Sequence, residues 1–92
     1  MLNRKNLTLK VTGRVQGVFY RATANEIAIE IGLKGFVMNM NDGSVFIEAE
    51  GTAEQLTKFI EWCKLGPSRS IVTDVNIQEG TVKEFTDFKI RY

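Results

Sequence analysis

The residue types best suited to chemistry lie together in the run GRVQGVFYR, residues 13–21. This run separates an alternating stretch that predicts a strand from an amphipathic stretch that predicts a helix. Backbone N–H groups at such a junction, the amino end of the helix and a nearby arginine form a site suited to a phosphate or a similar anion. Gly13 and Gly17 allow the backbone angles that a loop around an anion requires, although an ordinary turn requires them too.

Arg14 and Arg21 are the two charged residues of this run. Arg21 falls in the first turn of the expected helix, where a positive charge is mildly unfavourable because it lies at the positive end of the helix dipole. A bound anion would remove this conflict, whereas a solvated surface arginine is the alternative interpretation. Arg14 either adds positive potential to the loop or lies on the surface, and the sequence favours neither.

Histidine is absent from the chain, and Cys63 is its only cysteine. The sequence therefore offers no Cys/His zinc site, no internal disulfide and no usual general acid or base near neutral pH. Any catalysis must then require little proton transfer. Cys63 falls on the apolar face of a predicted helix, which indicates a core residue in a protein of the reducing cytoplasm.

Length and charge limit the domain organisation and the partners. The 92 residues, of which 43% are apolar, suffice for one domain, which we place at residues 6–92 after a loose polar tail at residues 1–5. A net charge of +1 is far from the basic excess of a surface built to bind nucleic acid. No run is long and apolar enough to cross a membrane. We expect a cytoplasmic monomer that binds neither nucleic acid nor a membrane.

Two helices are predicted by apolar residues at spacing i, i+3, i+4 and i+7. The first ends at Gly32. The second begins with a capping box of Thr52 and Gln55 and stops before Pro67. The apolar positions are Ala24, Ile27, Ala28 and Ile31 in the first helix, and Leu56, Phe59, Ile60 and Cys63 in the second.

Alternation of apolar and polar residues predicts the strands. They span residues 7–12, 35–40, 44–50 and 71–78 and the last residues from Phe88. In the strand at residues 71–78 we expect Val75 and Ile77 to face inward.

The turn sequence NDG at residues 41–43 joins the second and third strands. A three-residue loop in which Gly43 forms a bulge would pair Val37 with Ile47 and place Asn39 on the helix-covered side of the sheet. A two-residue loop would reverse both faces. We favour the bulge, because Asn followed by Asp suits the centre of a type I turn before a left-handed glycine.

The order of elements is βαββαβ followed by one short strand. This order predicts an α+β ferredoxin-like sandwich with two helices on one face of an antiparallel sheet. The fold hosts many unrelated activities, so the motifs must decide the function.

Three segments, GRVQGVFYR, GLKGFVMNMNDGSVFIEAEG and FKIRY, resemble the acylphosphatase family, and the resemblance extends over essentially the whole chain. It implies that the first motif forms a phosphate-binding loop ending in an essential arginine, here Arg21, and that the second supplies an essential asparagine, here Asn39. It also implies hydrolysis of the carboxyl–phosphate bond of small acyl phosphates without metal or cofactor. The residues expected to bind the substrate phosphate are Val15, Gln16, Gly17, Val18, Phe19, Tyr20 and Arg21.

Phosphoryl chemistry agrees with this resemblance. The carboxylate leaving group of an acyl phosphate is stable as an anion, so the lack of histidine is no obstacle. The guanidinium of Arg21 can bind two phosphoryl oxygens, while the amide of Asn39 can hold one water in line with the phosphorus. We expect the proton of that water to pass to the substrate phosphate.

Some residues depart from the family pattern. Phe19 replaces a frequent glycine, Tyr20 a usual phenylalanine and Met38 a frequent basic residue, and these changes bear on substrate preference. Tyr92 ends the sequence, and its carboxylate is a possible partner of Arg21.

Two other functions remain open from the sequence alone. One is a nucleic-acid-binding module in which Phe36 and Phe46 stack with bases on the open face of the sheet. Glu48 and Glu50 share the outer face with Phe46, which argues against this function. The other is a non-catalytic anion sensor, or a detached relative of the acylphosphatase-like domains of larger maturation proteins.

Overall fold

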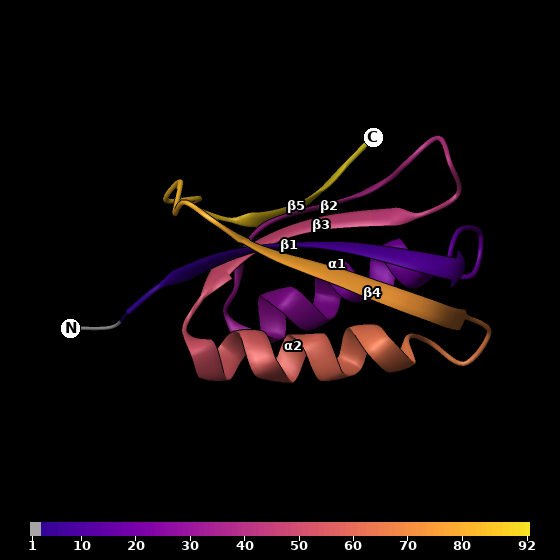
Figure 1. The fold of residues 1–92 in the computed structure, drawn as a ribbon, viewed down its shortest axis with the longest axis horizontal. Coiled ribbons are helices and arrows are strands. Elements are labelled where there is room, and N and C mark those ends of the chain that lie inside the picture. The colour runs from indigo at the N-terminus through magenta and orange to yellow at the C-terminus, as the bar shows by residue number, and fades with distance from the viewer. Residues whose placement is uncertain (1–2) are drawn as a thin grey trace.

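The computed structural model describes residues 3–92, so residues 1–2 of the predicted tail lie outside the described residues (Figure 1). The predicted order of elements is confirmed, and the first strand begins at Lys5, the last residue of that tail. The elements are β1 (Lys5–Arg14), α1 (Tyr20–Ile31), β2 (Lys34–Asn39), β3 (Val45–Gly51), α2 (Ala53–Leu65), β4 (Ile71–Gly80) and β5 (Phe88–Arg91).

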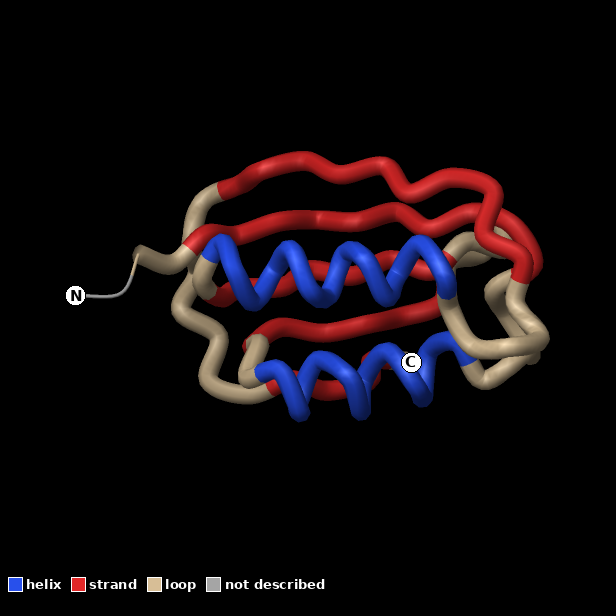
Figure 2. Tube along the Cα trace, turned by 90° about the horizontal axis from the view of Figure 1, so that it is seen from below, coloured by secondary structure: helices blue, strands red, loops and turns tan. Residues whose placement is uncertain are grey.

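The strands form one sheet in the order β4-β1-β3-β2-β5, and both helices cover the same face of it (Figure 2). The ferredoxin-like sandwich is therefore confirmed. The prediction that the sheet is antiparallel is wrong at one edge, because β5 pairs with β2 in parallel. Since β4 and β2 run in opposite directions, a chain that turns back after β4 and docks beside β2 must run parallel to β2.

The hairpin of β2 and β3 has the predicted three-residue loop. Val37 pairs with Ile47 and Asn39 with Val45. The amide of Gly43 donates to the carbonyl of Met40 at 3.2 Å, and Gly43 has the left-handed φ of 92° that the bulge requires. Because Val37, Val45 and Ile47 are fully buried, Asn39 lies on the helix-covered side of the sheet.

The core lies between the sheet and the two helices. Fully buried side chains from the sheet, such as Leu9 and Val11, meet Ala24 of α1 and Phe59 of α2. On β4 the predicted inward side chains differ from each other. Val75 packs against the core, whereas Ile77 pairs with the buried Leu9 yet stays 38% exposed, because β4 is an edge strand.

A side-chain hydrogen bond links the two helices at the end of the sandwich that lies far from residues 13–21. The predicted capping box is confirmed: Thr52 Oγ1 accepts from the amide of Gln55 at 3.2 Å, and Gln55 Oε1 accepts from the amide of Thr52 at 2.9 Å. The side-chain nitrogen of Gln55 donates to the carbonyl of Ile31 at 3.1 Å. Gln55 therefore links the start of α2 to the end of α1.

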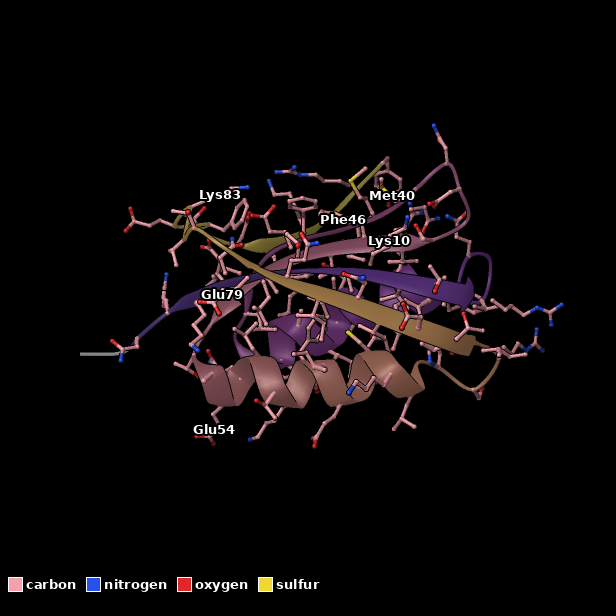
Figure 3. The ribbon with its side chains drawn as sticks, in the orientation of Figure 1. Lys10, Met40, Phe46, Glu54, Glu79 and Lys83 are labelled. Atoms are coloured by element: carbon pink, nitrogen blue, oxygen red, sulfur yellow. The ribbon has the colours of Figure 1, made fainter. Side chains whose placement is uncertain are left out.

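The outer face of the sheet is partly covered by the segment after β4. Figure 3 shows Lys83 of that segment on the side of the sheet away from the helices. Lys10, Met40 and Phe46 lie on the same side. Glu50 is 1% exposed there and accepts hydrogen bonds from Asn6 and from the amides of Lys83 and Phe85. Neither helix described in residues 3–92 is long and apolar enough to cross a membrane.

Candidate active site

The loop between β1 and α1 passes twice through the left-handed region of backbone angles, at Gly17 with φ 73° and at Phe19 with φ 65°. Phe19 immediately precedes α1 and supplies no side-chain cap. The amide of Thr23 donates the first helical hydrogen bond, to the carbonyl of Phe19 at 3.0 Å. Outside the strands and helices of residues 3–92, no backbone-to-backbone hydrogen bond is donated by an amide of residues 16–21. The backbone N–H groups at the amino end of α1 are therefore free to bind an anion beside this loop.

Tyr20 anchors the loop to the second helix. Its side chain is fully buried, and its hydroxyl donates to the carbonyl of Cys63 at 2.7 Å. Its ring lies 5.1 Å from that of Trp62, centroid to centroid. The pKa of Tyr20 is raised far above its usual range, mainly by burial and to a smaller extent by the neighbouring Cys63. The hydroxyl therefore keeps its proton and stays a donor. This bond gives the hydroxyl of Tyr20 a structural role.

A cavity of about 290 Å³ opens beside the loop and brings together the two residues that the sequence singled out, Arg21 and Asn39. The residues that line it are Val15, Gly17, Phe19, Tyr20, Arg21, Ala22, Asn39, Ile90 and Tyr92. Of the loop residues predicted to bind phosphate, Gln16 and Val18 do not line the cavity. Val18 packs against the core instead.

The guanidinium of Arg21 lies 4.7 Å from the centre of the Tyr92 ring. Among the ion pairs of residues 3–92, none joins Arg21 to the carboxylate of Tyr92, so the contact is with the ring. An aromatic face attracts a cation without occupying its N–H donors in the plane of the guanidinium. Arg21 is thereby held while its planar fork remains available to an oxyanion.

Asn39 ends β2 with its side chain directed to the helix-covered side of the sheet. Its Oδ1 atom is buried and has no hydrogen-bond partner within residues 3–92. A buried polar atom without a partner costs about 1–3 kcal/mol. Asn39 also lines the cavity that contains Arg21, so its side-chain amide is suited to a water or to a polar ligand there.

Gln16 joins the loop to the β2–β3 hairpin. Its side-chain nitrogen donates to the carbonyl of Met40 and to the carbonyl of Ser44, each at 2.8 Å. The sequence predicted a role for the backbone of Gln16 but none for its side chain. Its side-chain bonds span 24 and 28 residues, so no local signal in the sequence indicates them.

The tip of the hairpin is also held from the outer face of the sheet. Asp42 accepts from the amide of Ser44 at 2.9 Å and lies 2.8 Å from the ammonium group of Lys10. The pKa of the Asp42 carboxyl is lowered below its usual range, mainly by the hydrogen bond from Lys10 and to a smaller extent by the hydrogen bonds from Ser44. The carboxylate of Asp42 therefore stays ionised and able to accept these hydrogen bonds at neutral pH.

Other sequence-predicted residues lie outside this arrangement. Arg14 is exposed and does not line the cavity. Phe36 is only 6% exposed and lies beneath the guanidinium of Arg91, 3.8 Å from the centre of its ring. Its ring is therefore not free to stack with a base. Ile90 lines the cavity without having been predicted to do so, and its alternation with Phe88 and Tyr92 at the end of the chain was the available signal. Tyr92 was expected near Arg21 through its carboxylate, and it lies there through its ring.

Metal-ligating side chains do not cluster in the part of the chain that the structure describes. No group of three or more His, Cys, Asp or Glu residues within residues 3–92 lies close enough to hold a metal ion. Cys63 is buried, and burial raises the pKa of its thiol to about 12. The thiol therefore stays protonated and packs as a core side chain.

Comparison with known proteins gives a consistent result. The acylphosphatase family model matches residues 7–90. An acylphosphatase from Marinobacter nauticus is 50% identical over 82 residues, which cover 88% of this chain and 89% of that protein. One from Thermotoga petrophila is 44% identical over 88 residues, which cover 96% of this chain and 98% of that protein.

The solved structures agree with the sequences. The crystal structure of acylphosphatase from Bacillus subtilis matches this fold with a TM-score of 0.93 at 37% identity, and the match covers 96% of this chain and 99% of that chain. By the extent of the family match and the identity to these relatives, the chain belongs to the acylphosphatase family.

Proposed function

We propose that this protein hydrolyses the carboxyl–phosphate bond of acyl phosphates to a carboxylate and inorganic phosphate, by in-line attack of water. The observation that carries the proposal is the cavity that Arg21 and Asn39 both line. The Oδ1 atom of Asn39 is also buried without a hydrogen-bond partner within residues 3–92. Family membership supports the same reaction.

The phosphoryl group is held by the loop and by Arg21. Amides of the loop and of the first turn of α1 donate to its oxygens, and the dipole of the helix favours the negative charge. The guanidinium of Arg21 donates to two of these oxygens, and it does so most strongly in the transition state, where their charge is rearranged. This loop is the proposed phosphate-binding loop, residues 15–21.

The attacking water is held by Asn39. The side-chain oxygen accepts one of the hydrogens of the water, which leaves a lone pair of the water directed at the phosphorus. The amide is neutral, so it orients the water and does not deprotonate it. The proton passes to an oxygen of the substrate phosphate, and the carboxylate leaves as an anion without needing a general acid.

The remaining wall of the cavity suits the acyl part of the substrate. Phe19, Ile90 and Tyr92 present apolar surface beside the phosphoryl position. Apolar and aromatic walls with a few convergent polar groups are typical of small-molecule sites. The proposal further includes a monomer in the cytoplasm that acts on small acyl phosphates, needs no cofactor and binds no nucleic acid; the single buried thiol supports the reducing compartment.

The decisive experiment measures hydrolysis of benzoyl phosphate by the wild type beside Arg21→Gln and Asn39→Ala. We expect kcat/KM to fall by roughly 10²–10³-fold in each variant, because each removes one preorganised group that acts in the transition state. Arg14→Gln is the matched control, since it removes an exposed arginine of the same motif and should retain activity.

The outcomes separate the activity from its assignment to residues. A wild type that binds inorganic phosphate in calorimetry but does not turn over any acyl phosphate would support the non-catalytic anion sensor. Folded Arg21→Gln and Asn39→Ala variants with full activity would contradict the site assignment.

A further inference from the structure

The side chain of Gln16 forms a bridge between two parts of the chain that each carry one half of the proposed reaction. The loop holds the phosphoryl group, and the hairpin carries Asn39. One nitrogen of Gln16 donates both of its hydrogens to the hairpin, at 2.8 Å to Met40 and 2.8 Å to Ser44. Two hydrogen bonds from one nitrogen fix both the distance and the orientation of the loop relative to the hairpin.

The two acceptors are the carbonyls that close the hairpin loop. Met40 directly follows Asn39, and Ser44 directly precedes Val45, the pairing partner of Asn39. The amide of Met40 also donates to the carbonyl of Ser44 at 2.8 Å. Gln16 is therefore attached to the backbone of both arms of the hairpin, one residue beyond the Asn39–Val45 pair on the side of the turn.

Hydrogen bonding within residues 3–92 does not hold the side-chain oxygen of Asn39. Its Oδ1 atom has no partner within residues 3–92, so the backbone that carries it determines where that atom lies. The second support of the hairpin tip is the ion pair of Lys10 and Asp42, whose side chains are 49% and 53% exposed. Exposed ion pairs constrain geometry weakly, which leaves the bridge from Gln16 as the more confining contact.

We propose that Gln16 is a positioning residue: its side-chain amide sets the place of Asn39, and so of the attacking water, relative to the phosphoryl group bound by the loop. This inference rests on the proposed function. Gln16 contacts neither the water nor the phosphorus through its side chain, because it does not line the cavity. Its side-chain role is separate from that of its backbone amide, which belongs to the loop.

The effect should fall on turnover and not on binding. Loss of the bridge leaves Arg21 and the loop amides in place, so the affinity for the phosphoryl group should stay within about threefold. A shift of the water by about 1 Å costs roughly 10²-fold in rate. We therefore expect Gln16→Leu, which removes both donors at similar volume, to lower kcat for benzoyl phosphate by about 10- to 100-fold at nearly unchanged KM.

A double variant tests whether Gln16 acts through Asn39. In the Asn39→Ala background no side chain remains to be positioned, so adding Gln16→Leu should lower kcat by less than about twofold. A full, multiplicative loss in the double variant would overturn the inference, because Gln16 would then act through the loop or through general stability.

Gln55→Leu is the matched control. It removes a glutamine that also donates to a backbone carbonyl, at 3.1 Å to Ile31, but at the opposite end of α1. We expect Gln55→Leu to lower Tm at least as much as Gln16→Leu and to leave kcat unchanged. Gln16→Met, an unbranched replacement without donors, decides the result if Gln16→Leu does not fold.

Calorimetry with inorganic phosphate separates the two proposals. An inactive wild type would refute the proposed hydrolysis. An active wild type beside a Gln16→Leu variant with unchanged kcat would refute the positioning role alone. A variant whose Kd for phosphate rises as much as its kcat falls would refute it as well, since the bridge would then support phosphate binding.

Discussion

The aromatic side chain of Phe19 is 74% exposed, although its backbone lies in the left-handed region at φ 65° and ψ 15°. This conformation costs a residue with a Cβ atom roughly 1–2 kcal/mol, and glycine avoids the cost. Strained backbone of this kind persists mainly at functional sites. Phe19 lines the cavity of Arg21, so we expect its ring to contact the substrate and to compensate for this strain.

Phe19→Gly should therefore gain stability and lose selectivity. We expect a free energy of unfolding up to about 1 kcal/mol higher, because the strain is relieved while little apolar burial is lost. The ratio of kcat/KM for benzoyl phosphate to that for acetyl phosphate should fall, because the ring is gone. Urea unfolding and initial rates measure the two effects.

Phe19→Ala is the control for this substitution. It removes the ring but keeps the Cβ atom at positive φ, so it should lose selectivity without gaining stability. Destabilisation of Phe19→Gly relative to Phe19→Ala would contradict the strain argument.

At the scale of elements, the site depends on how α1 is joined to α2. The carbonyl of Cys63 is among the last four of α2, which accept no hydrogen bond from an amide of the helix itself. The hydroxyl of Tyr20 donates a hydrogen bond to it at 2.7 Å. Tyr20 is the first residue of α1 and directly precedes Arg21. The bond thus fixes the end of the helix that carries the arginine.

Tyr20→Phe should destabilise the protein by about 1–3 kcal/mol, because it leaves a buried carbonyl without a donor. The buried ring still packs against Trp62 and keeps this end of α1 in place in the folded protein, so kcat should stay near the wild-type value. Urea unfolding checks the first expectation and benzoyl phosphate hydrolysis the second. Tyr92→Phe is the control, since the Tyr92 side chain is 94% exposed and its hydroxyl should add nothing to stability. Equal stability of the two variants would contradict the role of the Tyr20 hydroxyl.

The sequence was sufficient to predict those features that residues close together in the chain determine. The capping box of Thr52 and Gln55 follows from residues three apart, and the face of Asn39 follows from the turn chemistry at residues 41–43. The bridge from Gln16 was not predictable in this way. Its acceptors are backbone carbonyls, which every residue possesses, and they come near Gln16 only once the sheet has formed.

At the scale of the whole molecule, the connection from β4 to β5 crosses from one edge of the sheet to the other (Figure 1). Its destination is β5, which leads to Ile90 and Tyr92 at the cavity. The parallel pairing of β5 was missed because alternation identifies a strand but not its neighbour. The burial of the Glu50 carboxylate was not predicted either, because its position on the outer face of the sheet indicated exposure. In the structure the amides of Lys83 and Phe85 donate to it.

Glu50 makes this arrangement sensitive to acid. Burial alone would raise its pKa, but the amide of Lys83, the side chain of Asn6 and the amide of Phe85 donate to the carboxylate and lower the pKa below its usual value. A lowered pKa in the folded state adds stability that is present above the pKa of the unfolded chain, about 4.3, and is lost as pH falls through the folded pKa. Acid should therefore loosen the segment that leads to β5.

Glu50→Gln should lose most of this acid dependence and be less stable at pH 7. The amide keeps one acceptor but places a donor against the N–H groups that the carboxylate satisfies, at a cost of about 1–3 kcal/mol. Urea unfolding of both proteins from pH 7 to pH 3 measures the effect, and the difference between their free energies of unfolding should shrink as pH falls below about 4. Glu79→Gln, at an exposed position on β4, should keep the wild-type profile. A difference between wild type and Glu50→Gln that stays constant over this range would show that Glu50 does not contribute to the acid sensitivity of the fold.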